Sequence, residues 1–127
     1  MNTKLQNAVI RQLGLTRKDE ELTTTLQDIT NHGINGGFSG FIYYADTIKF
    51  FKNNRKAIIE LVREMAQDFG QDPIEMVAGF NCLTNDFETR EEIARALYGR
   101  LASDDTQVAN ALAWFAAEEV ARSMTDN

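Results

Sequence analysis

Apolar side chains recur every three or four positions along most of the chain, which is the spacing of one face of an α-helix. The strict apolar and polar alternation of a β-strand is almost absent. Segments with the helical spacing lie near residues 5–13, 19–33, 40–52, 58–70, 73–80, 89–101 and 103–121. The pattern therefore predicts an all-α fold, a compact single-domain bundle of about six to seven short helices that spans residues 1–127.

Capping residues mark where the predicted helices begin and end. Gly14, Gly33 and Gly70 each follow an apolar stripe, and glycine readily takes the left-handed conformation that terminates a helix. Asp72 can accept hydrogen bonds at an N-cap, with Pro73 at the first helical position. The other predicted boundaries are N-caps at Thr16, Ser39 and Thr89 and a helix end at Asn53–Asn54.

The apolar stripes of these helices form the predicted core. Phe69 and Tyr98 come at the ends of two stripes, and the pattern places both on the buried side. In the last segment Val108, Leu112 and Phe115 share a face, and small side chains flank it at Ala109, Ala113, Ala116, Ala117 and Ala121. Such a smooth surface lets helices approach closely, either inside the fold or at a contact between subunits.

The composition limits the classes of partner. The chain carries 13 Lys and Arg residues against 19 Asp and Glu, for a formal net charge of −6. Nucleic acid is repelled by this charge unless the bases gather on one face, so no direct nucleic-acid partner is expected. The one cysteine, Cys82, excludes an intramolecular disulfide and is interpreted as a small buried residue in a reducing compartment. No apolar run is long enough to span a bilayer, and we expect a cytoplasmic protein with no membrane contact.

Charged residues alternate in blocks of one sign. Residues 1–18 hold bases and no acid, 19–48 hold acids and no base, 49–66 carry net positive charge, and 67–88 again hold acids only. The acids that can contribute to an acidic face are Asp19, Glu20, Glu21, Asp28, Asp68, Asp72, Glu75, Asp86 and Glu88. Folding either gathers these acids on one face or leaves them as part of an ordinary mixed surface.

The stretch NHGINGGFSGFIYY at residues 31–44 contains the only histidine of the chain. A hydrolase nucleophile elbow, G-x-S-x-G, requires glycine where the chain has Phe41, and the phosphate-binding G-x-x-x-x-G-K-[ST] motif fails at Phe38 and Ser39. His32 has no partners at the familiar zinc-ligand spacings, so no catalytic residue, cofactor or metal is expected. The candidate contacts for an anion or a partner are His32, Asn35, Gly36, Gly37, Phe38 and Ser39, because a glycine-rich turn before a helix presents free N–H groups.

The segment HGINGGFSGFIYYADT, with a looser match through KNNRKAIIEL to VAGFNC, resembles small proteins of bacteriophages and other mobile elements. This resemblance carries no assigned activity. It implies a context, namely an accessory protein of a mobile element in a bacterial cytoplasm.

Three hypotheses follow from these observations. The first is a non-enzymatic protein-binding module, in that context a counter-defence inhibitor whose acidic surface occupies the nucleic-acid channel of a host restriction or CRISPR complex. The second is a small-ligand or anion-binding protein, or a small enzyme, centred on the glycine-rich loop at residues 32–39. The third is a structural homodimer joined through the alanine-rich last segment.

Overall fold

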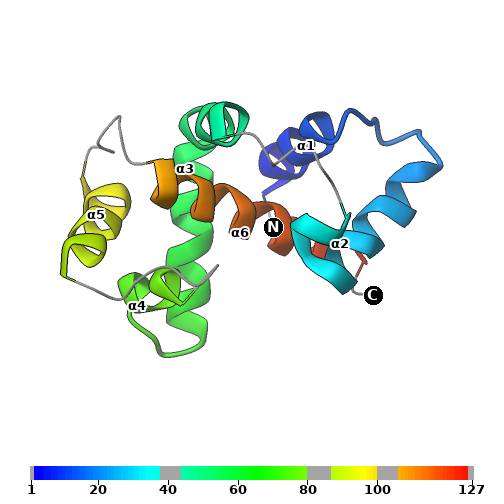
Figure 1. The fold of residues 1–127 in the computed structure, drawn as a ribbon. Coiled ribbons are helices and arrows are strands. Elements are labelled where there is room, and N and C mark those ends of the chain that lie inside the picture. Colours follow the sequence, from blue (N-terminus) through cyan, green and yellow to red (C-terminus); the bar gives the residue numbers. More distant parts are fainter. Residues whose placement is uncertain (1, 38–43, 80–86, 100–105, 126–127) are drawn as a thin grey trace.

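The structure, a computed structural model, describes residues 2–37, 44–79, 87–99 and 106–125 (Figure 1). Within these ranges the chain forms helices and turns, with no strand. The helices are α1 (Thr3–Gln12), α2 (Glu21–Gly37), α3 (Tyr44–Asp68), α4 (Pro73–Ala78), α5 (Phe87–Tyr98) and α6 (Thr106–Thr125). The predicted all-α fold is confirmed.

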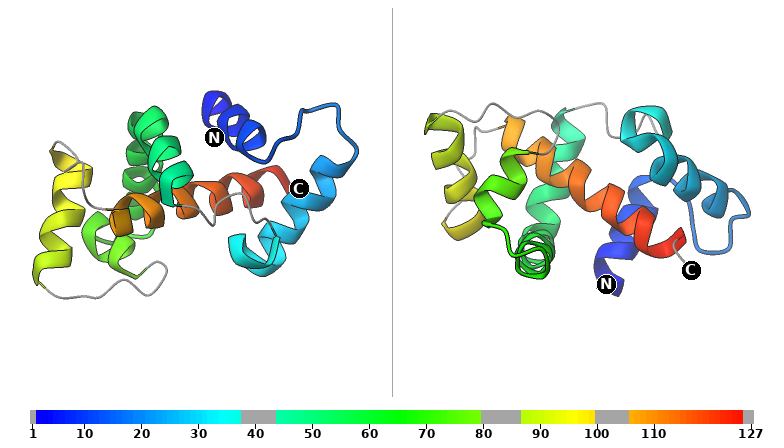
Figure 2. Two further views of the ribbon diagram at one scale, coloured as in Figure 1. Left: turned by 45° about the horizontal axis from the view of Figure 1, so that its top comes forward. Right: turned by 90° about the horizontal axis from the view of Figure 1, so that it is seen from below.

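Helix α6 crosses the middle of the molecule, and the other helices are arranged around it (Figures 1 and 2). α3 and α5 lie beside its first half, and α1 and α2 lie beside its second half. Its predicted apolar face is buried, and so are all five flanking alanines at positions 109, 113, 116, 117 and 121. The small side chains therefore serve packing inside the fold, mainly against α2 and α3.

Two of the predicted helix ends are closed by glycine in the left-handed conformation. Gly14 has φ 75° and Gly70 has φ 62°. The N–H of Gly70 donates to the carbonyl of Gln67, and that of Gln71 donates to the carbonyl of Ala66, which together form a Schellman motif. Gly14 and the residue that follows it make the same pair of bonds at the end of α1.

The predicted start of α4 is also confirmed. The Asp72 carboxylate accepts from the backbone N–H groups of Ile74, at 2.8 Å, and Glu75, at 3.4 Å, with Pro73 in the first turn. Asn2 caps α1 in the same way, through the N–H groups of Lys4 and Leu5. Side-chain oxygens at these positions satisfy N–H groups that have no partner within the helix.

Two of the predicted breaks are kinks inside longer helices. Gly33, with φ 76° and ψ 179°, ends the regular part of α2, but a further helical turn follows it. Gly36 and Gly37 belong to that turn and are not the non-helical connection predicted for them. In α3 the kink is at Asn54, with φ −123° and ψ 17°, whose side-chain amide donates to the Phe50 carbonyl at 2.9 Å. A side chain that bonds a carbonyl one turn back competes with the helical ladder and favours a bend.

Two predicted N-caps are wrong. Thr16 closes a turn of its own, because its N–H donates to the Asp19 carboxylate at 2.7 Å, and α2 begins only at Glu21. Thr89 lies within α5, which begins at Phe87. A capping pattern satisfies backbone N–H groups in an isolated turn as well as at a helix start, so the pattern alone does not fix the boundary. Ser39 and Cys82 lie outside the described residues.

Among the described residues, no helix combines the length and the apolar character that crossing a membrane requires.

Candidate functional site

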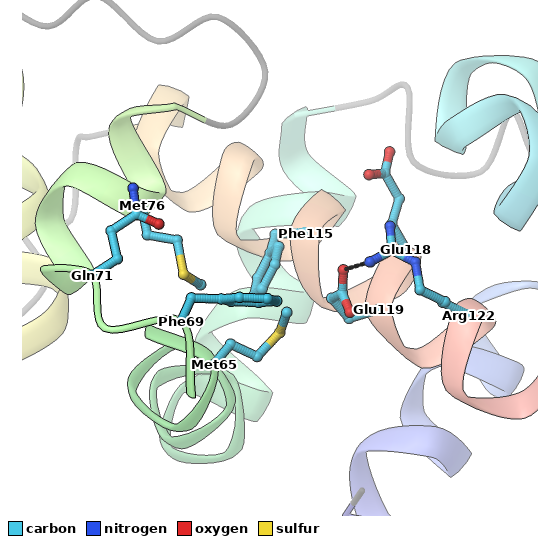
Figure 3. A pocket seen from close by; sticks show the side chains of 8 residues that line it. All are labelled: Met65, Phe69, Gln71, Met76, Phe115, Glu118, Glu119 and Arg122. Carbon is cyan, nitrogen blue, oxygen red and sulfur yellow. Dashed lines mark hydrogen bonds and ion pairs between the residues drawn. The ribbon is translucent and has the colours of Figure 1, made fainter. Parts of the chain in front are cut away.

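A hollow of about 330 Å³ lies between the end of α3, α4 and the second half of α6 (Figure 3). One part of its wall is apolar and the other is charged. The lining residues are Met65, Phe69, Gln71, Met76, Phe115, Glu118, Glu119 and Arg122. Segments 65–76 and 115–122 are distant in sequence, and the packing of α3 against α6 brings them together. We call this site the Phe69 hollow.

Phe69 is the most exposed large apolar side chain of the described residues, with 71% of its surface accessible. Its predicted place in the core is wrong. α3 ends at Asp68, and Phe69 occupies the position before the left-handed Gly70, so its ring follows the turn and leaves the buried stripe. The side chains of Met65 and Met76 reach toward the ring, while Phe115 behind them is buried (Figure 3).

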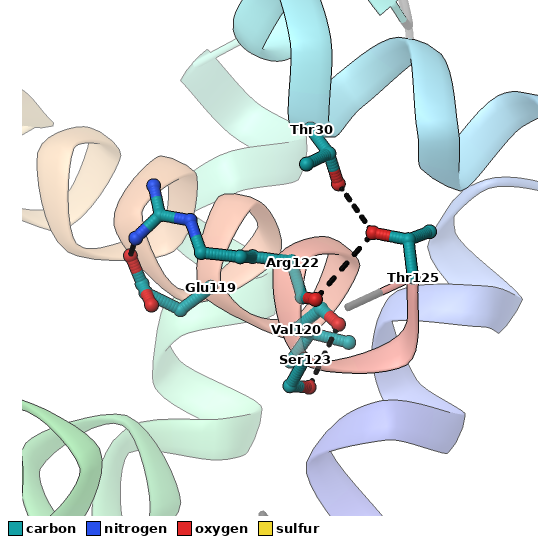
Figure 4. A network of polar contacts seen from close by, with 6 residues as sticks. All are labelled: Thr30, Glu119, Val120, Arg122, Ser123 and Thr125. Carbon is teal, nitrogen blue, oxygen red and sulfur yellow. Dashed lines mark hydrogen bonds and ion pairs between the residues drawn. The ribbon is translucent and has the colours of Figure 1, made fainter. Parts of the chain in front are cut away.

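The charged part of the hollow is formed by α6. The Arg122 guanidinium donates to the Glu119 carboxylate at 2.7 Å, one turn apart on the same helix (Figures 3 and 4). The Glu119 side chain is only 13% accessible. Burial raises the pKa of the Glu119 carboxyl above 4.5, Arg122 lowers this pKa and Glu118 raises it further. The net direction is upward, because the lost hydration outweighs the nearby guanidinium.

Polar contacts at the C-terminal end of α6 fix this helix against α2. The hydroxyl groups of Thr30 and Thr125 form a hydrogen bond of 2.9 Å between the two helices (Figure 4). Thr125 also donates to the carbonyl of Ala121 at 2.8 Å, and Ser123 donates to that of Val120 at 2.9 Å. The Thr30–Thr125 bond therefore ties the end of α6, just after Glu119 and Arg122, to α2, while the other two bonds lie within α6.

Tyr98, the second aromatic residue predicted for the core, is 55% accessible. Its ring lies beneath the Arg63 guanidinium, 4.8 Å from the ring centroid. The prediction of a buried Tyr98 is therefore wrong. The Arg63 guanidinium covers one face of the ring, and the rest of the side chain stays accessible at the end of α5.

The structure separates the acidic candidates into two groups. Asp19, Glu20, Glu21 and Asp28 are exposed on α2 and the turn before it, whereas Asp68, Asp72 and Glu75 are exposed around the α3–α4 turn. Figures 1 and 2 place α2 and α4 at opposite ends of α6, so these two groups do not form one face. Glu75 faces Arg90 of α5 at 3.6 Å. The side chains of Asp86 and Glu88 lie outside the described part of the structure.

The glycine-rich candidate contacts are described only in part. His32 is exposed on the last regular turn of α2. A Cβ added at Gly33 would lie 3.4 Å from a carboxylate oxygen of Glu118, so this kink packs against α6. Asn35 belongs to the short helical turn with Gly36 and Gly37, while Phe38 and Ser39 lie outside the described ranges.

Within the described ranges, no group of three or more His, Cys, Asp or Glu side chains is placed to hold a metal ion. The sequence pattern did not single out the Phe69 hollow as a site. One local signal was available, namely an aromatic residue directly before a helix-terminating glycine, because the last residue of a helix no longer follows the buried face.

The structure thus shows a small helical domain with a surface hollow whose wall is apolar in one part and charged in the other. The chain belongs to the family described as "Domain of unknown function (DUF7222)", whose model matches residues 2–127. No curated protein and no solved structure matches the chain.

Proposed function

We propose that the protein is a non-enzymatic binding module that docks a partner protein at the Phe69 hollow. The observation that carries this proposal is the 71% exposure of the Phe69 ring on a helix end fixed by a Schellman motif. Large aromatic side chains on well-ordered turns contribute strongly to protein interfaces, since they bury much apolar area and lose little conformational entropy on binding.

The side chains around Phe69 suit a partner surface of definite chemistry. Met65 and Met76 are flexible and polarisable, which lets them adapt to the shape of an apolar side chain. Glu119 faces the same hollow and pairs with the Arg122 guanidinium. The Glu118 carboxylate lies beside Gly33 of α2 instead. The complementary partner presents an apolar side chain beside a lysine or arginine, because a cation lowers the cost of ionising the largely buried Glu119 carboxyl.

The resemblance to mobile-element proteins directs the choice of partner. In that context the partner is a host protein, and a restriction or CRISPR complex is the specific target that we propose to test first. The two acidic groups lie at opposite ends of α6, so a single acidic face does not serve as the basis of this counter-defence function. We propose contact through the Phe69 hollow in its place.

The test compares the wild-type protein with Phe69→Ala and Tyr98→Ala. Both variants remove a large exposed aromatic side chain, but only Phe69 lines the hollow. Each variant is expressed in a bacterial host that carries a restriction or CRISPR system, and the plating efficiency of a sensitive phage is measured. We expect the wild type and Tyr98→Ala to protect the phage, and Phe69→Ala to lose most of this protection while retaining its circular dichroism spectrum.

Affinity capture from the same cells with the three proteins as bait provides the second readout. The proposal requires at least one host protein to be retained by the wild type and Tyr98→Ala and lost with Phe69→Ala. It is rejected if the wild type alters neither defence system and retains no host protein. Equal retention by all three baits would show that docking does not use the hollow.

A further inference from the structure

We propose that the groove between α1 and the first part of α3 binds a ligand that carries two or more phosphate groups. This groove is separate from the Phe69 hollow and has a volume of about 930 Å³. It lies where the kink at Asn54 turns the first part of α3 alongside α1 (Figures 1 and 2). The fold thereby joins the base-rich segments 1–18 and 49–66, which are separated by an acidic block in the sequence.

The lining of the groove is basic and rich in amides. Its charged residues are Lys4 and Arg11 of α1 and Lys49 of α3, and no carboxylate lines it among the described residues. Carboxamide side chains fill much of the remaining wall, including Asn7 and Asn53. A groove whose charged residues are all cationic is unusual for a chain with a net charge of −6, whose acids outnumber its bases.

Neighbouring amides, and not acids, hold the base next to this groove. The Arg17 guanidinium donates to the side-chain oxygens of Asn7, at 2.9 Å, and Gln6, at 3.1 Å. No acidic group lies within 4.0 Å of the cationic groups of Lys4, Arg11 or Lys49 in the part of the chain that the structure describes. A ligand with several negative charges would therefore be attracted by these cations together, without competition from an acidic side chain of the described residues.

The spacing of the cations favours more than one phosphate. Lys4 and Arg11 are seven positions apart on α1, which places them on one face at a separation of roughly 10 Å along the axis. Lys49 faces them from α3. Lys, Arg, Asn and Gln side chains are the usual contacts of phosphate and sugar groups, whereas base stacking requires an exposed aromatic ring. The one aromatic residue in the lining, Phe50, is buried, so recognition rests on phosphate groups.

Two sources supply this chemistry, a nucleic-acid strand and a free oligophosphate such as a nucleoside triphosphate. The test measures fluorescence anisotropy of a labelled oligothymidylate of about 20 nucleotides at salt concentrations from about 50 to 200 mM. Unlabelled tripolyphosphate and ATP are added as competitors in separate titrations. Displacement by these small molecules at micromolar concentration identifies a free oligophosphate ligand, and displacement by unlabelled oligonucleotide alone identifies a strand.

The variant Arg11→Gln/Lys49→Gln removes two cations from the groove, and Arg90→Gln/Arg95→Gln removes the same charge from α5, which contributes no residue to the lining. We expect the groove variant to weaken binding by about tenfold or more at the lowest salt. The slope of log affinity against log salt concentration should become shallower by about 0.7 for each cation removed. The control should change affinity by less than about twofold, because distant charges are screened.

A separate variant, Asn53→Asp, places a carboxylate in the groove without a change of size and should weaken binding in the same direction. The proposal is overturned if the wild type binds neither the oligonucleotide nor tripolyphosphate at low salt. It is also overturned if the groove and control variants bind alike, or if polyglutamate competes as well as tripolyphosphate, since the groove would then attract any anion.

Discussion

At the residue scale, Gly33 is the position where the backbone most requires glycine. Its φ of 76° and ψ of 179° belong to a region that residues with a Cβ rarely adopt. The nearest atom to an added Cβ, a Glu118 oxygen at 3.4 Å, leaves almost enough room, so backbone strain dominates the cost. We expect Gly33→Ala to lower the free energy of unfolding by about 1–3 kcal/mol, measured by urea denaturation.

The matched control is Gly79→Ala at the end of α4. Gly79 has φ −77° and ψ −13°, which any residue adopts, and the nearest atom to an added Cβ lies 3.5 Å away. This variant should unfold within about 0.5 kcal/mol of the wild type. If the two variants unfold at the same urea concentration, the kink at Gly33 does not exist in solution.

Glu119 is expected to make the stability depend on pH. Its pKa is raised above 4.5 in the folded state, chiefly by burial, so the folded chain holds this proton to higher pH than the unfolded chain. The stabilisation that the protonated Glu119 carboxyl contributes is therefore complete at pH values below its pKa in the unfolded chain. It is lost as the pH rises through the higher pKa of the folded chain. Glu119→Gln removes the ionisation, and at neutral pH it should be at least as stable as the wild type.

The measurement compares urea midpoints of the wild type and Glu119→Gln at neutral pH and below about pH 4, where the difference should disappear. Glu20→Gln, at an exposed position, makes the same change in net charge and serves as the control. A wild type that is clearly more stable than Glu119→Gln at neutral pH would mean that the Arg122 ion pair outweighs the burial of the carboxylate.

At the element scale, two arginines of α3 hold the C-terminal end of α5. Arg63 donates to the Leu97 carbonyl at 2.8 Å, and Arg55 donates to the carbonyls of Ala96, at 3.2 Å, and Gly99. The last carbonyls of a helix have no partner within the helix and carry partial negative charge. The guanidinium groups therefore cap α5 from a neighbouring helix.

The stacking of Arg63 on Tyr98 is tested with a double-mutant cycle. Arg63→Ala is expected to destabilise the protein by about 1–2 kcal/mol, because it removes a charged hydrogen bond as well as the stacked cation. The cycle with Tyr98→Ala should give a coupling energy of about 0.5–1 kcal/mol from urea denaturation. Additive effects of the two substitutions would rule out the ring contact.

Helix boundaries were predictable where one residue determines the local backbone. Gly14 and Gly70 end helices because glycine accepts positive φ, and Asp72 begins one because its carboxylate accepts from free N–H groups. Prediction failed where tertiary contacts decide. Asn54 was predicted to end a helix, but α3 continues past it with a kink. Tyr98 was predicted to be buried, but it lies at the surface with the Arg63 guanidinium over its ring.

At the scale of the whole molecule, the sequence showed blocks of charge but not their arrangement. Folding around α6 places the acids of α2 and those of the α3–α4 turn at opposite ends, and it joins the bases of α1 and α3 in one groove. Local spacing carries no information on which helices become neighbours, so the lining of the groove and of the Phe69 hollow could not be predicted, although the exposure of Phe69 itself had a local signal. These sites depend on the contacts of α3 with α1 and with α6.

The alanines of α6 distinguish a packed monomer from a dimer joined through this helix. Ala117 has no accessible surface, so a leucine at this position must displace helices already packed against α6. We expect Ala117→Leu to lower the free energy of unfolding by about 1–3 kcal/mol, while Ser123→Leu, at an exposed position of α6, changes it by less than about 0.5 kcal/mol. Urea denaturation at two protein concentrations about tenfold apart is the decisive measurement. Burial within one chain requires midpoints that do not depend on concentration, and a midpoint that rises with concentration in the wild type and not in Ala117→Leu would place these alanines at a subunit contact instead.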